Sequence, residues 1–89
     1  MNTIWKFAIA PGEQVVAMPK GSKIIHAAAM FGGLFLWAEV DSEAPLVNRL
    51  IEAAGTGHAR DDSTPTYVGT ATDHALVWHV YDHGEATNQ

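Results

Sequence analysis

The sequence contains no cysteine, few cationic residues and no long apolar run. Without cysteine the chain can form neither a disulfide nor a thiolate metal site, so a small domain must rely on packing or on self-association. A membrane span needs about 18 or more apolar residues. The most apolar stretch, 24–40, is interrupted by His26, Gly32, Gly33 and Glu39. We therefore expect a soluble chain without a signal peptide, in a reducing cytoplasm.

Lysine and arginine are scarce as well. Five of them stand against ten aspartates and glutamates, which gives a formal net charge of −5. This charge disfavours attraction to phosphate backbones and anionic lipids, so we expect no direct nucleic-acid partner and no membrane partner. A basic protein surface is the natural electrostatic complement, although such acidity often serves only solubility.

The remaining composition is that of one folded domain. The chain has 89 residues, of which 47% are hydrophobic and 17% charged, far from the signature of disorder. Too few residues are present for a second domain. We expect a single β-rich domain over 1–82 and a flexible polar tail over 83–89.

Short segments with apolar or aromatic alternation recur between glycine and proline turns, which predicts strands. These segments are 3–9, 14–18, 23–31, 34–40, 67–72 and 75–81. The first two are expected to form a hairpin. Gly32-Gly33 suits a primed turn between the next two, because both positions tolerate positive φ. The last two are expected to close a hairpin around Asp73-His74.

Segment 45–54 is ambiguous. Val47, Leu50, Ile51 and Ala54 have helical spacing, and Gly55 could end a helix. The sequence therefore predicts a mainly β protein, a small antiparallel sheet of six to seven strands curled into a barrel or sandwich, with a short helix at 45–54 as an alternative to a strand.

Five motifs follow one another along the chain. They are Thr3-Ile4-Trp5-Lys6-Phe7, Met18-Pro19-Lys20-Gly21, Leu36-Trp37-Ala38-Glu39-Val40-Asp41, Gly55-Thr56-Gly57-His58 and Val77-Trp78-His79-Val80. As a set, they resemble a family of small bacteriophage and prophage proteins without an assigned activity. The resemblance covers about residues 3–81. It implies a strand before Gly55 and a location in the cytoplasm of a bacterial host, and it supplies no catalytic residues.

Acidic residues gather in two loops and the adjoining strand ends. If the fold brings those loops together, they form a negative patch for a basic partner surface. The candidate partner-binding residues are Glu39, Asp41, Glu43, Glu52, Asp61 and Asp62. A solvated polar rim is the competing interpretation.

A second candidate site surrounds the glycine-bearing loop. The loop at 55–58, with Gly57, could present backbone N–H groups to an anion. His58, Arg60 and Arg49 would supply positive charge, and Trp37 would provide a stacking surface for a nucleotide-like ligand. The competing interpretation of the loop is a tight turn that requires positive φ.

Metal binding and catalysis have little support in the sequence. The spacing of the five histidines fits no known zinc pattern, so we expect neither a metal nor a cofactor. Hydroxyls at Thr56 and 63–66 lie near His58 but lack a catalytic motif, so we expect no enzyme. The three tryptophans lie in predicted strands and are expected in the core.

The functional hypothesis follows from size, acidity and the phage resemblance. The resemblance implies a phage accessory protein that inhibits a bacterial defence complex by protein binding, as anti-CRISPR proteins do. The alternatives are a sponge for a nucleotide-like immune signal and a virion structural or assembly protein. Because strands 24–31 and 34–40 are apolar on both faces, we also expect a homodimer if 45–54 is a strand rather than a covering helix.

Overall fold

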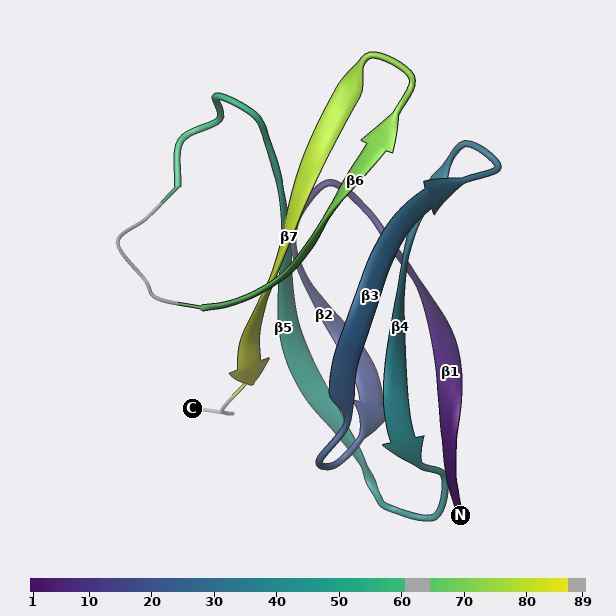
Figure 1. The fold of residues 1–89 in the computed structure, drawn as a ribbon. Coiled ribbons are helices and arrows are strands. Elements are labelled where there is room, and N and C mark those ends of the chain that lie inside the picture. The colour runs from purple at the N-terminus through teal and green to yellow at the C-terminus, as the bar shows by residue number, and fades with distance from the viewer. Residues whose placement is uncertain (61–64, 87–89) are drawn as a thin grey trace.

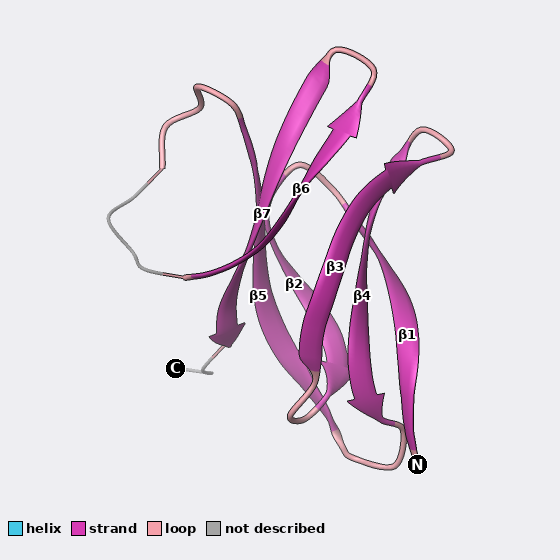
Figure 2. Cartoon of the chain, viewed as in Figure 1, coloured by secondary structure: helices cyan, strands magenta, loops and turns pink. Residues whose placement is uncertain are grey.

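The computed structural model describes residues 1–60 and 65–86, and this part of the chain is all β. Figure 2 shows strands joined by loops, without a helix. The strands are β1 (Asn2–Ile9), β2 (Gly12–Pro19), β3 (Lys23–Met30), β4 (Gly33–Asp41), β5 (Leu46–Gly55), β6 (Thr66–Asp73) and β7 (Leu76–Glu85). None of the described residues belongs to a helix able to cross a membrane.

The strands form two antiparallel sheets that pack as a sandwich (Figure 1). One sheet has the order β1-β4-β3 and the other the order β2-β5-β7-β6. The predicted mainly β fold of six to seven strands is confirmed. The sheets are not closed into a barrel, so the sandwich alternative is the correct one.

Alternating side chains of both sheets fill the space between them. In β4 the inward residues Leu34, Leu36, Ala38 and Val40 are buried, as the period of two dictates. The facing sheet contributes Met18, Ile51, Ala53 and Val80. Trp78 is partly buried and packs against this core, whereas Trp5 is 37% exposed and Trp37 lies half-buried on the outer side of its sheet, so the prediction of core tryptophans is confirmed only for Trp78. Alanine and larger aliphatic residues fill the fully buried positions.

Segment 45–54 forms β5, so the strand prediction is confirmed and the helix alternative is wrong. β5 lies inside its sheet and pairs with β2 on one side and β7 on the other. Backbone pairing on both edges, together with burial of Ile51 and Ala53, outweighs the helical spacing of its apolar residues.

β1 and β2 do not form the expected hairpin, because they belong to different sheets. β1 pairs with β4, and β2 pairs with β5. Between them Pro11 lacks an N–H donor, Gly12 has φ 95°, and the Ala10 amide donates to Gln14 Oε1 at 2.8 Å. These features turn the chain from one layer to the other.

The expected boundary of the tail at residue 82 is also wrong. β7 continues to Glu85, and Ala86 N–H donates to the Asn48 carbonyl at 2.8 Å. Asp82 and His83 both bond to side chains of β5, which holds this polar end of the strand in place. Residues 87–89 of the predicted tail lie outside the described part.

The two other predicted hairpins are confirmed, with each turn shifted by one residue. Met30 pairs with Gly33, so the first turn consists of Phe31 and Gly32, with φ values of 52° and 77°. Asp73 pairs with Leu76, so His74 lies in the second turn, with φ 53°. The first is a two-residue turn with positive φ at both positions, as a primed turn requires.

Candidate functional site

The outer side of the β1-β4-β3 sheet is not covered by any described element, and we call it the aromatic face. Its members alternate with the inward-facing residues along each strand, except at the β-bulge around Ile25 in β3. They are Ile4, Lys6, Ala8, Lys23, His26, Ala28, Met30, Phe35, Trp37 and Glu39.

Aromatic and cationic groups contact one another at the centre of this face. The Trp37 ring centroid lies 6.5 Å from that of Phe35 and 5.5 Å from that of His26. Lys6 Nζ lies 4.9 Å from the Phe35 ring centroid, a cation–π contact. Trp37 and Phe35 remain half-buried with no second layer above them. Such a continuous aromatic surface is typical of a protein contact.

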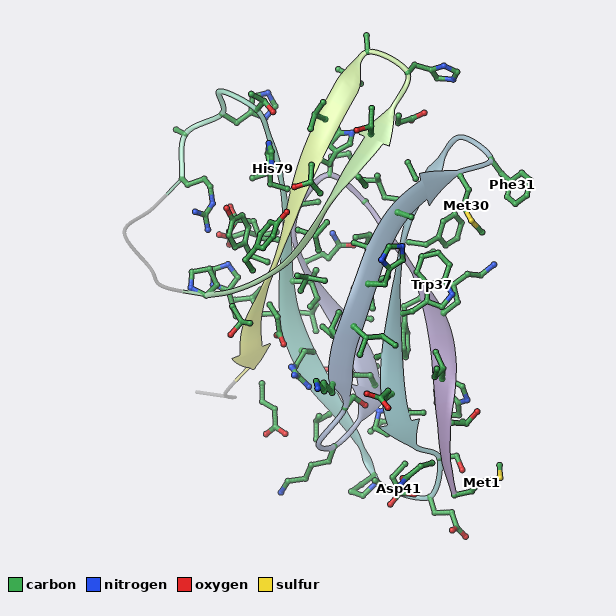
Figure 3. All side chains as sticks on the ribbon, viewed as in Figure 1. Met1, Met30, Phe31, Trp37, Asp41 and His79 are labelled. Carbon is green, nitrogen blue, oxygen red and sulfur yellow. The ribbon has the colours of Figure 1, made fainter. Side chains whose placement is uncertain are left out.

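Phe31 extends this surface at the tip of the β3–β4 hairpin (Figure 3). Its side chain is 95% exposed, and its φ of 52° lies in the left-handed region that bulky residues rarely adopt. Figure 3 shows the ring projecting away from the strands, next to Met30. Both features disfavour phenylalanine in the isolated monomer, so its presence indicates a role outside the fold.

Replacing Phe31 with asparagine is therefore expected to stabilise the protein by about 1 kcal/mol, because Asn-Gly is a preferred primed turn and tolerates positive φ. Thermal unfolding measures the effect. Leu76→Asn is the control, since Leu76 is exposed beside the other hairpin turn but lies in a strand. A Phe31→Asn protein that melts below the wild type would show that the ring contributes to folding.

The acidic residues of the β4 end and the following loop lie close to the chain's first residue. The Met1 amine lies 3.3 Å from Asp41 Oδ1 and 3.2 Å from Glu43 Oε2, at the end of the sandwich where Figure 3 labels Met1 and Asp41. The amine donates hydrogen bonds to Glu43 and to Asp41, and these bonds raise its pKa. The pKa of Asp41 is lowered by the Glu43 backbone N–H and then by the amine. Glu39 is exposed on the aromatic face, near Lys23.

Glu52 does not join this acidic group, which corrects its assignment to a partner-binding patch. It lies on the outer side of the other sheet, 8% exposed. Arg60 donates to both of its carboxylate oxygens at 3.0 and 2.9 Å, and His83 Nε2 lies 2.9 Å from Oε1. Arg60, followed by His83, lowers the pKa of Glu52. Asp61 and Asp62 lie outside the described residues.

The same cluster contains ligand types that could hold a metal ion. Ligand atoms of Glu13, Glu52 and His83 lie within 4.8 Å of one another, on three adjacent strands. Both Glu52 oxygens already accept hydrogen bonds, and Arg60 supplies the compensating positive charge. A divalent ion would have to displace this arginine, so the donor set fits a structural ion pair better than a metal centre.

The structure brings only part of the candidate anion-binding set together: His58 and Arg60 line one hollow of about 480 Å³, which the carboxylates of Glu13 and Glu52 also line. Arg49 forms a two-pronged ion pair with Asp82 at 3.1 and 2.8 Å, and Arg60 is paired with Glu52. His58 packs edge-on against Trp78, with ring centroids 6.1 Å apart. Trp37 lies on the other sheet. Gly57 has φ 85°, which fits the tight-turn interpretation of this loop.

The sequence did not predict a hydrogen-bond network between His79 and three hydroxyl groups. His79 Nε2 lies 2.7 Å from Thr56 Oγ1, and its Nδ1 lies 3.2 Å from Thr70 Oγ1, which also bonds to the Tyr67 hydroxyl. The sequence placed Thr56 near His58 instead, because only the β5–β7 pairing brings residue 79 beside residue 54. The arrangement satisfies both ring nitrogens and ties the end of β5 to β6 and β7.

The comparisons with known proteins point to one family. The model of the family described as Domain of unknown function (DUF7352) matches residues 1–89. Neither the curated proteins nor the solved structures yielded a match.

Proposed function

Since the chain belongs to the DUF7352 family, whose description specifies no activity, we propose from its surface that it is a protein-binding module that acts through the aromatic face and Phe31. In its finer form, the proposal is that the partner is a bacterial defence complex and that binding inhibits it, as anti-CRISPR proteins do. The phage resemblance of the five sequence motifs supports the finer form. Phe31 carries the proposal.

Phe31 is energetically unfavourable in the free monomer. A phenylalanine with positive φ stores backbone strain, and a ring that is 95% exposed gains no burial energy in the monomer. Burying such a side chain in a partner would contribute about 2 kcal/mol or more from the hydrophobic effect alone. An exposed aromatic residue at the tip of a two-residue turn is thus suited to anchor an interface.

The neighbouring residues are of the types that dominate protein interfaces. Aromatic residues and methionine are enriched at interface centres, and Trp37, Phe35 and Met30 provide them on the same side of the sheet. The opposite sheet offers a different surface, since its charged groups Arg49, Glu52 and Arg60 are already paired within the chain. The pairing of both arginines also argues against a nucleotide sponge, which needs free cations for phosphate.

The experiment is a quantitative pull-down from host lysate with three immobilised proteins: the wild type, Phe31→Asn and Leu76→Asn. A defence-complex subunit should be captured by the wild type and by Leu76→Asn, and lost at least tenfold with Phe31→Asn. Equal capture by the wild type and by Phe31→Asn would contradict binding through the aromatic face and Phe31. A blank with the wild type would count against the binding function.

A further inference from the structure

The geometry points to β1 as the docking edge, and we infer that it takes an extended, acidic segment of a partner protein as an added strand. This inference rests on the proposed binding function and names the chemistry of the partner. β1 pairs with β4 on one side only, and no described strand continues its sheet on the other side. Its open edge of eight residues therefore offers backbone N–H and C=O groups for β-augmentation.

The two sides of β1 differ in chemistry. Trp5 points to the inner side, opposite Ala38, yet it remains 37% exposed because it lies at the edge of the sandwich. Lys6 points to the aromatic face and forms no ion pair with any described residue. An added strand that alternates apolar and acidic residues would place apolar side chains beside Trp5 and carboxylates beside Lys6.

Lys6, in the middle of the open edge, favours an acidic segment there over a basic one. All three lysines, Lys6, Lys20 and Lys23, lie on this sheet or at its end, whereas both arginines are bound in ion pairs elsewhere. Lys20 and Lys23 line a hollow of about 630 Å³ that reaches β1 at Asn2, Thr3 and Ile4. Two carboxylates, those of Glu39 and Asp41, also line this hollow, and Asp41 is paired with the Met1 amine.

Two other occupants fit less well. A second copy pairing through β1 would bring Lys6 toward its own counterpart, and a lysine in the middle of an edge strand opposes such self-association. A nucleic acid has no peptide backbone, so it could not pair with the N–H and C=O groups along the open edge of β1. The occupant is therefore an acidic protein segment rather than either of these.

The test uses two short synthetic peptides, one alternating glutamate and leucine and one alternating lysine and leucine, titrated into the isotope-labelled protein and followed by NMR. The glutamate peptide should bind more tightly, shift the resonances of β1, and slow hydrogen exchange at alternate β1 amides. Lys6→Glu should weaken its binding about tenfold and reverse the preference between the peptides. Glu85→Lys, on the other sheet, should change the affinity by less than about twofold.

The outcomes separate the two proposals. If Glu85→Lys strengthens binding as much as Lys6→Glu weakens it, only net charge matters and the β1 inference is overturned. Equal binding of both peptides, or shifts confined to other strands, also overturns it, while Phe31-dependent capture in the pull-down would still support the binding function. Binding of oligothymidine at β1, or a dimer in light scattering that Lys6→Glu abolishes, would replace the acidic segment with another occupant.

Discussion

Shortening the chain after Tyr81 is expected to unfold the protein, whereas shortening it after Ala86 is expected to leave it folded. The first truncation removes Asp82, the partner of Arg49, whose side chain is only 13% exposed. Leaving a buried charge without its partner costs about 3–5 kcal/mol. That cost approaches the whole stability of a small domain, about 5 kcal/mol.

Far-UV circular dichroism and thermal melting measure both truncations. The matched point variant is Asp82→Ala, which removes the carboxylate but keeps the strand, compared with Asp73→Ala on β6. Asp82→Ala should lower the melting temperature much more than Asp73→Ala. A protein ending at Tyr81 that melts like the wild type would show that the end of β7 does not stabilise the sandwich.

Replacing Glu52 with glutamine is expected to destabilise the protein at neutral pH by about 2 kcal/mol. The amide of glutamine carries no negative charge for Arg60, and it has only one oxygen to accept hydrogen bonds from Arg60 and His83. The estimate is below the range for fully buried pairs because the Arg60 side chain is 27% exposed. Glu85→Gln is the control, since Glu85 is an exposed glutamate at the end of β7.

Glu52 should also make the stability of the protein depend on pH. The pKa of Glu52 is lower in the folded protein than in the unfolded chain, because Arg60 and His83 favour its charged form. Its stabilising contribution is therefore fully present above the unfolded pKa and is lost as the pH falls through the folded pKa. Urea unfolding measured from neutral to acidic pH should show that the free energy of unfolding falls for the wild type and falls by a smaller amount for Glu52→Gln. Parallel curves would contradict the assignment.

The strands were predictable because a strand is a local pattern. The alternation of Leu34, Leu36, Ala38 and Val40 with Phe35 and Trp37 is visible in the sequence, and the structure buries the first set. The turn at 31–32 was predicted one residue too late, because glycine is the usual residue at positive φ and two glycines were available. Phe31 was therefore overlooked as a surface anchor.

The candidate site was predicted less well, because its contacts join residues far apart in sequence. Glu52 and Arg49 were assigned to binding surfaces as single charged residues. Their partners His83 and Asp82 lie at the end of β7, beyond the strand 75–81 that the sequence predicted. Polarity alone cannot distinguish a frayed end from a strand whose polar side chains are paired.

The sequence by itself determined that this chain forms a mainly β protein with six strand segments, since apolar residues at a spacing of two must share one face of an extended chain, and it left segment 45–54 open between a strand and a helix. Only the tertiary structure decided how strands distant in sequence pair, which apolar face is covered and which stays open. β1 pairs with β4 rather than β2, and this arrangement leaves Phe31 and the open edge of β1 exposed and Trp37 half-buried. The physical reason is that pairing depends on the summed burial of two whole sheets, which no local segment encodes.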